Sequence, residues 1–231
     1  VKDINFIKTA TKIMIGSEYQ IQNNSEEYTG VKVPQFSFNR LANADNRLGV
    51  EMLSTGEVAC FGENYQEAYL KALSATGFKI KNKCNVLISI GSQFDKEELL
   101  NSIKLLSDNG FTLFGTSGTA NYYKKLNIKI TSLEIDTIYE NIKEGVFGLV
   151  INISIPNKIR KKSKTDGYYI RRLSIDYNID VIINIKCAKL YIDSIVSYYN
   201  NSKKIGDFDV KTTNRYIKLP MCIDMHVHVR E

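Results

Sequence analysis

Short apolar strands alternate with helical segments through the second half of the sequence, and this alternation constrains the fold more than any other feature. Five strand-like runs are each followed by a segment with helix-like spacing or helix start and stop signals: 86–90, 111–114, 129–133, 147–153 and 180–185. The run at 147–153 is almost continuously apolar, as expected for a strand covered on both faces. Strands joined through helices lie parallel. The sequence therefore predicts an α/β fold, a doubly wound parallel sheet with helices on both faces.

The helices of this sheet are expected at 95–109, 120–126, 136–144, 166–178 and 188–200. Asp95 is the predicted cap at the start of the first helix, and Gly110 the glycine that ends it.

A cluster of small hydroxyl side chains lies between the predicted strand at 111–114 and the helix at 120–126. Its members are Thr116, Ser117, Gly118 and Thr119. Free N–H groups and the positive end of the helix dipole favour an anion at such a place, and glycine lets the backbone approach it closely. Serine and threonine are also ordinary helix caps. A phosphate site and a plain helix start thus both remain open.

Asn152 ends the strand at 147–153, so we expect its side chain at the same carboxyl edge, where ligands bind in folds of this kind. A lysine-rich stretch at 157–164 follows, and Arg171 and Arg172 come on the next helix. Three interpretations stay open for these cations: a solvated surface, a cationic rim over the anion site, or an RNA-binding face. No aromatic residues interleave with the lysines and no known nucleic-acid motif is present.

The first section, residues 1–78, has too few elements to bury a core alone. It contains a helix at 6–15, a strand at 31–38, a strand-like stretch at 51–62 that Gly56 breaks, and a helix at 64–74. We expect its packing partners upstream of Val1.

The last section contains the only two histidines, His226 and His228, in a strand that begins at Tyr216 after a polar linker. Residues two apart in a strand point to the same face, so both imidazoles can bind one metal ion. Two histidines alone cannot hold a catalytic zinc ion, and no further partner is identified here, so any metal site is incomplete.

Composition is that of a soluble globular protein, with 231 residues of which 43% are hydrophobic and 24% charged. No apolar run approaches the ~20 residues that a membrane helix needs. The four cysteines form no CxxC pair and predict reduced thiols in a cytoplasmic protein. A net charge of +6 suits both anionic small ligands and nucleic acid, and it does not distinguish between them. The missing initial methionine and the abrupt end at Glu231 suggest a segment of a longer polypeptide.

Several motifs, in this order, resemble a junction in the multifunctional proteins of de novo pyrimidine (UMP) synthesis. Residues 6–16 and 31–38 resemble the end of the second ATP-grasp unit of carbamoyl-phosphate synthetase, and the stretch at 51–62 is specific to that enzyme. Residues 82–203 resemble its regulatory domain, which has the methylglyoxal-synthase fold. Residues 217–231 resemble the opening of dihydroorotase, so 204–216 would be a linker.

The resemblance implies a fused eukaryotic protein that also carries glutamine-hydrolysing and aspartate carbamoyltransferase activities. The implied effectors are a UTP- or UMP-type inhibitor and phosphoribosyl pyrophosphate as activator, and a homo-oligomer is expected. By position, the family's effector contacts match Lys96, Thr116, Ser117, Gly118, Thr119 and Asn152. The basic loop after Asn152 is longer than in the family.

The resemblance also implies that this segment alone is not catalytic. The ATP-grasp carboxylates that hold magnesium and ATP lie upstream of Val1. His226 and His228 match zinc ligands of dihydroorotase, and Arg230 matches a residue that binds the substrate carboxylate. A stand-alone enzyme of the methylglyoxal-synthase type is the main alternative, and an RNA-binding module a lesser one. The first needs catalytic carboxylates, and we expect none at the Thr116 turn or beside Asn152.

Overall fold

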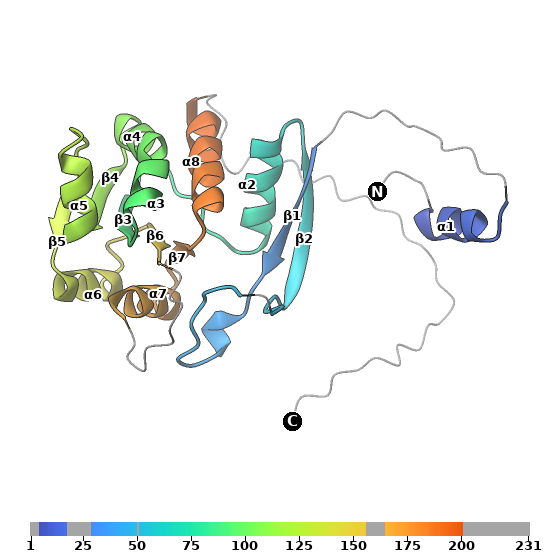
Figure 1. Cartoon of the computed structure of the whole chain (residues 1–231), viewed down its shortest axis with the longest axis horizontal. Coiled ribbons are helices and arrows are strands. Elements are labelled where there is room, and N and C mark those ends of the chain that lie inside the picture. The colour runs from blue at the N-terminus through green and yellow to red at the C-terminus, as the bar shows by residue number, and fades with distance from the viewer. Residues whose placement is uncertain (1–4, 18–28, 50, 156–164, 201–231) are drawn as a thin grey trace.

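The computed structural model describes residues 5–17, 29–49, 51–155 and 165–200 (Figure 1). The predictions for the basic stretch at 157–164, the linker and the histidine-bearing segment at 217–231 lie outside these residues. No helix in the described ranges is long and apolar enough to cross a membrane.

Five parallel strands form the central sheet, in the spatial order β5-β4-β3-β6-β7. Their bounds are β3 (Asn85–Ile90), β4 (Thr112–Thr116), β5 (Thr131–Leu133), β6 (Leu149–Ile153) and β7 (Asp180–Ile182). The chain starts in the centre with β3, builds outward through β4 and β5, and then returns to the other side of β3 with β6. The two halves meet between β3 and β6, and ligands bind at such a switch point in open parallel sheets. The predicted fold class is confirmed.

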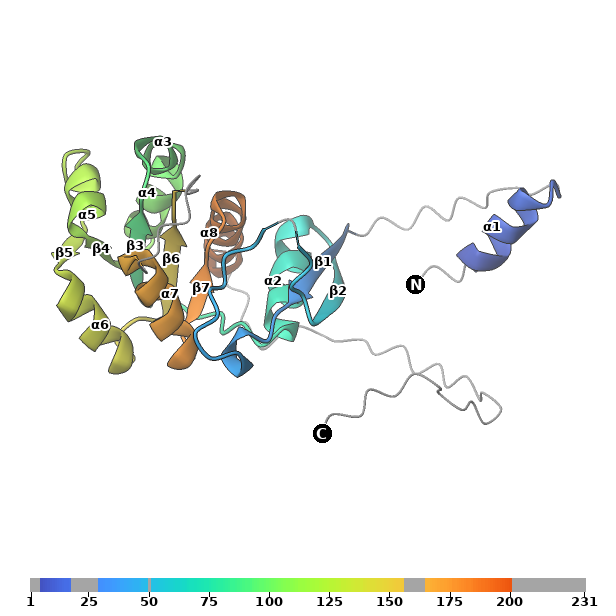
Figure 2. The same ribbon diagram turned by 60° about the horizontal axis from the view of Figure 1, so that its bottom comes forward.

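Helices cover both faces of the sheet (Figures 1 and 2). One face packs under α4 (Leu100–Asp108), α5 (Ser117–Lys124) and α8 (Ile185–Asn200), and the other under α6 (Ile135–Lys143) and α7 (Asp166–Asp176). Successive side chains of β3 alternate between the two cores, with Val86 and Ile88 in the first and Leu87 in the second. This alternation explains why every apolar side chain of β3 and β6 is buried.

The first helix of the sheet domain differs from its prediction. It is divided into α3 (Gln93–Glu98) and α4, and its cap is Ser92, not Asp95. The Ser92 hydroxyl accepts from the Asp95 N–H and donates to the Asp95 carboxylate. The two residues thus form a reciprocal pair resembling a capping box, in which Asp95 takes the third helical position.

The first section forms α1 (Phe6–Met14), β1 (Thr29–Gln35), the short 3-10 helix η1 (Phe38–Arg40), β2 (Gly56–Gly62) and α2 (Tyr65–Ala75). β1 and β2 pair antiparallel, and β2 begins at Gly56, the residue expected to break it. α2 contributes Tyr69, Leu70 and Leu73 to the same core as α8. The sheet domain and the section before it therefore share apolar packing through α2.

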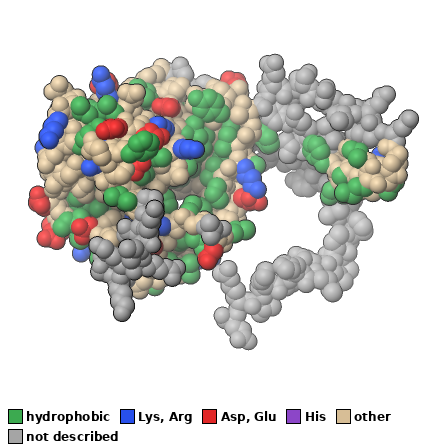
Figure 3. Space-filling view, viewed as in Figure 1, with side chains coloured by type: hydrophobic (Ala, Val, Ile, Leu, Met, Phe, Trp, Pro, Cys, Tyr) green, Lys and Arg blue, Asp and Glu red, His purple; other side chains and the backbone are tan. Residues whose placement is uncertain are grey.

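Apolar side chains remain exposed on this first section (Figure 3). α1 buries none of its residues among those described, and Ile7 and Met14 are 81% and 85% exposed. Met52, between the two strands, is 88% exposed. Uncovered apolar surface of this kind is typical of a contact site. The expectation that the packing partners lie upstream of Val1 stays a prediction.

Candidate effector site

The candidate site lies where β3, β4 and β6 end and α3 and α5 begin. The Gly91 N–H donates to the Ile153 carbonyl at 2.9 Å, which ties the end of β3 to that of β6. The Ile90 N–H donates to the Thr119 hydroxyl at 3.0 Å, which ties β3 to the first turn of α5. The hydroxyl cluster and the strand ends are thus held at one edge of the sheet, as the sequence predicts.

Thr119 has a structural position within this edge. Its side chain is 1% exposed, and its hydroxyl lies 3.3 Å from the Ile90 carbonyl and accepts from Thr116 Oγ1 at 3.1 Å. All its hydrogen-bonding capacity is used inside the fold. The hydroxyl of Thr119 therefore does not offer the direct effector contact expected from the sequence; instead it holds the first turn of α5 against β3.

The other members of the cluster remain accessible. Thr116 and Ser117 are half-buried, Gly118 is exposed, and a Cβ added at Gly118 would have no atom within 4 Å. The helix begins at Ser117, three residues earlier than expected, so Ser117, Gly118 and Thr119 form its first turn. Thr116 precedes that turn and makes no side-chain cap hydrogen bond. The first N–H groups of α5 are left for another acceptor.

Lys96 lies beside α5 on the neighbouring helix α3. Its ammonium is 6.0 Å from the centroid of the Tyr122 ring, and its backbone carbonyl accepts from the Tyr123 hydroxyl at 3.0 Å. Tyr122 is more than one turn beyond the start of α5. The contacts of Lys96 are therefore with the middle of α5 and not with its first turn.

Asn152 is buried, with 1% of its surface exposed, on the face of the sheet that α7 covers. Its Oδ1 accepts from Arg171 Nη1 at 2.8 Å. Arg171 is also 1% exposed, and its Nε and Nη2 donate to the two carboxylate oxygens of Asp45 at 2.9 and 2.7 Å. The Asp45–Arg171–Asn152 network was missed from the sequence, where Asp45 belongs to a polar turn and Arg171 to a basic stretch.

Arg172, the next residue of α7, binds the backbone of the first section close to Asp45. Its Nη1 contacts the carbonyls of Phe38, Leu41 and Ala44 at 3.0 to 3.2 Å. The hydrogen bond from Arg172 also lowers the pKa of the Asp176 carboxyl. We call residues 38–47 the docking segment. The sequence leaves three interpretations open for Arg171 and Arg172: a solvated surface, a cationic rim and an RNA-binding face. None of them holds for these two residues, because both are buried against this segment.

One carboxylate does approach the hydroxyl cluster. Glu134, at the end of β5, lies with its Oε1 3.4 Å from the Ser117 hydroxyl. The expectation of no acidic residue at this turn is therefore wrong. Glu134 is exposed, so solvent screens its charge from a neighbouring anion.

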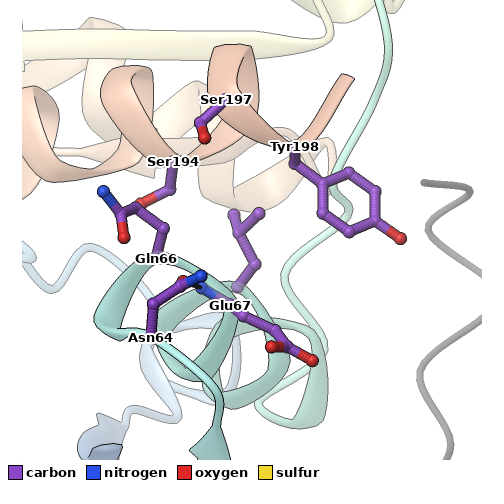
Figure 4. A pocket seen from close by; sticks show the side chains of 7 residues that line it. Asn64, Gln66, Glu67, Ser194, Ser197 and Tyr198 are labelled. Carbon is purple, nitrogen blue, oxygen red and sulfur yellow. Dashed lines mark hydrogen bonds between the residues drawn. The ribbon is translucent and has the colours of Figure 1, made fainter. Parts of the chain in front are cut away.

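Two hollows elsewhere in the described structure do not involve the predicted effector residues. One, of about 30 Å³, lies between Asn64, Gln66 and Glu67 near the start of α2 and Ser194, Ser197 and Tyr198 of α8 (Figure 4). It has room for a water molecule but not for a nucleotide. The other is an apolar groove of about 600 Å³ between β1 and β7.

A metal site is not found in the described part of the chain, where no three His, Cys, Asp or Glu side chains gather. His226, His228 and Arg230 lie outside it. Cys60, Cys84 and Cys187 are free thiols, and burial raises the pKa of the Cys84 thiol.

Comparison with known proteins places this geometry in a family. Residues 98–183 match the family described as MGS-like domain. The chain is 48% identical over 99% of its length to Multifunctional protein pyr1-3 of Dictyostelium discoideum, and 42% identical over 99% to Multifunctional protein CAD of Squalus acanthias. It is 36% identical over 92% to the mitochondrial Carbamoyl-phosphate synthase [ammonia] of Aquarana catesbeiana. It covers 11%, 11% and 15% of these relatives.

The matched residues include β4, β5, β6 and β7, so this part of the parallel sheet is that of an MGS-like domain. The chain as a whole is similar to one part of these multifunctional proteins and of a carbamoyl-phosphate synthase, and the family resemblance found in the sequence is confirmed.

Proposed function

We propose that this chain is part of a glutamine-hydrolysing carbamoyl-phosphate synthetase, aspartate carbamoyltransferase and dihydroorotase fusion that acts in UMP synthesis. Residues 82–203 are its allosteric domain, which binds a UTP- or UMP-type nucleotide or phosphoribosyl pyrophosphate. These ligands share a phosphate group, and the uncapped first turn of α5 supplies N–H donors for one. That uncapped turn at the carboxyl edge, next to the open Gly118, is the observation that carries the proposal.

The effector contacts in this proposal are Thr116, Ser117 and the backbone at Gly118. Asn152 in β6 and Lys96 on α3 are further contacts. Thr119 does not contact the effector in this proposal; its hydroxyl, which is hydrogen-bonded within the fold, holds the first turn of α5 in place. Net charge of +6 for the whole chain favours an anionic ligand in general.

The parent protein would be an ATP-dependent ligase, with ATP and magnesium bound in upstream synthetase domains. The apolar side chains left exposed on residues 5–78, such as Ile7 and Met52, support a covering partner of this kind. The segment at 217–231 would start a dihydroorotase domain, where His226 and His228 bind zinc and Arg230 binds the substrate carboxylate. The segment alone is then non-catalytic, and the full protein a cytoplasmic homo-oligomer.

Calorimetric titration of the chain with UTP, UMP and phosphoribosyl pyrophosphate tests the effector site. Each of Thr116→Ala and Ser117→Ala should weaken binding about 10-fold, the effect of losing one hydrogen bond to a charged group. Thr112→Ala is the matched control, because Thr112 is exposed at the opposite end of the same strand. Equal affinity of all the variants would reject this site.

A stand-alone enzyme of the methylglyoxal-synthase type is the second candidate, and Glu134 beside Ser117 is the one observation in its favour. It predicts turnover of dihydroxyacetone phosphate that Glu134→Gln abolishes. Under the main proposal a colorimetric assay for methylglyoxal detects no turnover by either protein.

A further inference from the structure

One guanidinium joins three elements that are distant in the sequence. Arg171 belongs to α7, Asn152 to β6, and Asp45 to the docking segment between β1 and β2. Arg171 and Asp45 are 126 residues apart, so the contact connects the section before the sheet domain with the candidate effector site inside it.

The geometry of this contact fixes the Asn152 amide. The guanidinium is planar, and two of its nitrogens are used by the Asp45 carboxylate, so the direction of the third, Nη1, is set by the position of Asp45. Nη1 in turn holds Asn152 Oδ1. Asn152 Oδ1 is thereby occupied, while its amide nitrogen has no hydrogen-bond partner among the residues that the structure describes.

Further contacts show that the docking segment lies directly over this part of the sheet. The Tyr168 hydroxyl donates to the Asn43 carbonyl at 2.9 Å, and Arg47 Nη2 lies 3.4 Å from the carbonyl of Ile155, two residues after β6 ends. The segment therefore spans both α7 and the end of β6. A ligand at the Asn152 end of the site would lie close to it.

Asp45 is the acidic partner on which this arrangement depends. Its side chain is 32% exposed, while that of Arg171 is 1% exposed. The charge of Arg171 is thus buried, and Asp45 is its only anionic partner in the described residues. A buried cation with one carboxylate partner moves when that partner moves, because leaving it unpaired is unfavourable.

We propose that Arg171 is a positioning residue which couples docking of residues 38–47 to effector binding at Asn152. The inference rests on the proposed effector site. With the segment docked, Asn152 presents its amide nitrogen to the ligand. By reciprocity, a bound ligand holds Asn152 and Arg171 in place and keeps the segment docked. Effector binding in this way stabilises the docked position of residues 38–47, which belong to the section before the sheet domain.

The test uses the whole chain with UTP and phosphoribosyl pyrophosphate as probes, and it has two readouts. Asp45→Asn keeps the shape of the side chain and removes its charge; it should weaken effector binding about 10-fold, which corresponds to a typical coupling between sites. Arg171→Lys should act in the same way, because a single ammonium cannot bridge both partners. Glu57→Gln is the matched control: it makes the same chemical change in the same section, at an ion pair with Lys32 that stays within β1 and β2.

The second readout is hydrogen–deuterium exchange in the unmodified chain, which does not depend on any variant folding. Saturating effector should slow amide exchange at residues 38–47, and a merely structural ion pair would not produce this effect. One outcome would refute the coupling and leave the effector site standing. In that outcome the effector binds, amide exchange at residues 38–47 stays unchanged, and Asp45→Asn binds the effector as tightly as Glu57→Gln does. If the unmodified chain binds none of UTP, UMP and phosphoribosyl pyrophosphate, the proposed function itself fails and the coupling with it.

Discussion

The Thr119 hydroxyl lies 3.0 Å from the backbone nitrogen of Ile90, and this contact joins the end of β3 to the start of α5. Ile90 is 4% exposed, so water cannot readily replace the hydroxyl as acceptor. The bond holds the N-terminal turn of α5 at the edge of the sheet, where its N–H groups face the candidate site.

Thr119→Val should therefore lower the free energy of unfolding by about 1–3 kcal/mol, because a buried N–H loses its acceptor while the shape of the side chain is kept. Urea denaturation followed by circular dichroism measures the change. Thr119→Ser, which retains the hydroxyl, should recover most of the loss, and Thr112→Val should have little effect. A Thr119→Val protein as stable as the unmodified one would show that this bond is not important.

Gly118→Ala separates the structural role of the first turn from its proposed function. The added Cβ meets no atom and the residue does not have a positive φ, so the helix should become more stable by about 0.5–1 kcal/mol. The same methyl group would stand where a phosphate approaches the backbone. We expect higher stability with weaker binding of UTP; unchanged binding would place the ligand away from Gly118.

Gly148 lies just before β6, where the chain passes close to Cys84. A Cβ added there would lie 2.5 Å from the Cys84 Cβ, too close for any side-chain rotation to relieve. Gly148→Ala should thus destabilise the fold by about 1–3 kcal/mol, measured as a lower midpoint of urea denaturation. Gly49→Ala serves as control because nothing lies within 4 Å of its added Cβ. Equal midpoints for the two variants would contradict the close approach.

Asp180 gives the stability a defined pH dependence. Burial raises the pKa of its carboxyl, although the Lys79 N–H, which donates to Oδ2 at 2.7 Å, lowers it in part. Because the folded state binds the proton more tightly than the unfolded state, protonated Asp180 contributes stability below its ordinary pKa, and this contribution is lost as pH rises through the folded pKa. Asp180→Asn does not titrate.

The stability of Asp180→Asn relative to the unmodified chain should therefore increase between about pH 3 and pH 7. Denaturation curves at several pH values would show this trend. Asp176→Asn offers a contrast of opposite sign, since the hydrogen bond from Arg172 lowers the pKa of the Asp176 carboxyl. Its effect should be small, because Asp176 is about half exposed.

The sheet could be predicted from the sequence because its signal is local. Each strand is a short apolar run and each helix repeats its apolar positions every three or four residues, so the parallel sheet and its helical layers follow from general rules. The strand order was not predicted and comes from the structure. The position of the hydroxyl cluster at the carboxyl edge followed for the same reason. The exact start of α5 did not, since a Ser-Gly-Thr turn is compatible with both a loop and a first helical turn.

The Asp45–Arg171–Asn152 network could not be predicted in this way. Nothing within a few residues of Asp45 or Arg171 indicates that they meet, and an arginine pair on a helix usually faces solvent. Glu134 was missed for a similar reason: it reaches Ser117 only because β4 and β5 are neighbours, with Thr116 paired to Leu133. Contacts of this kind depend on the tertiary fold and not on local periodicity.

The anchoring of the docking segment by Arg172 also has a consequence for biosynthesis. The carbonyls of Phe38, Leu41 and Ala44 leave the ribosome 128 to 134 residues before the arginine that binds them. At ordinary translation speeds this interval is roughly 6–27 s. During that time water is the hydrogen-bond partner of these carbonyls, and the docking segment takes its place only after α7 has been made.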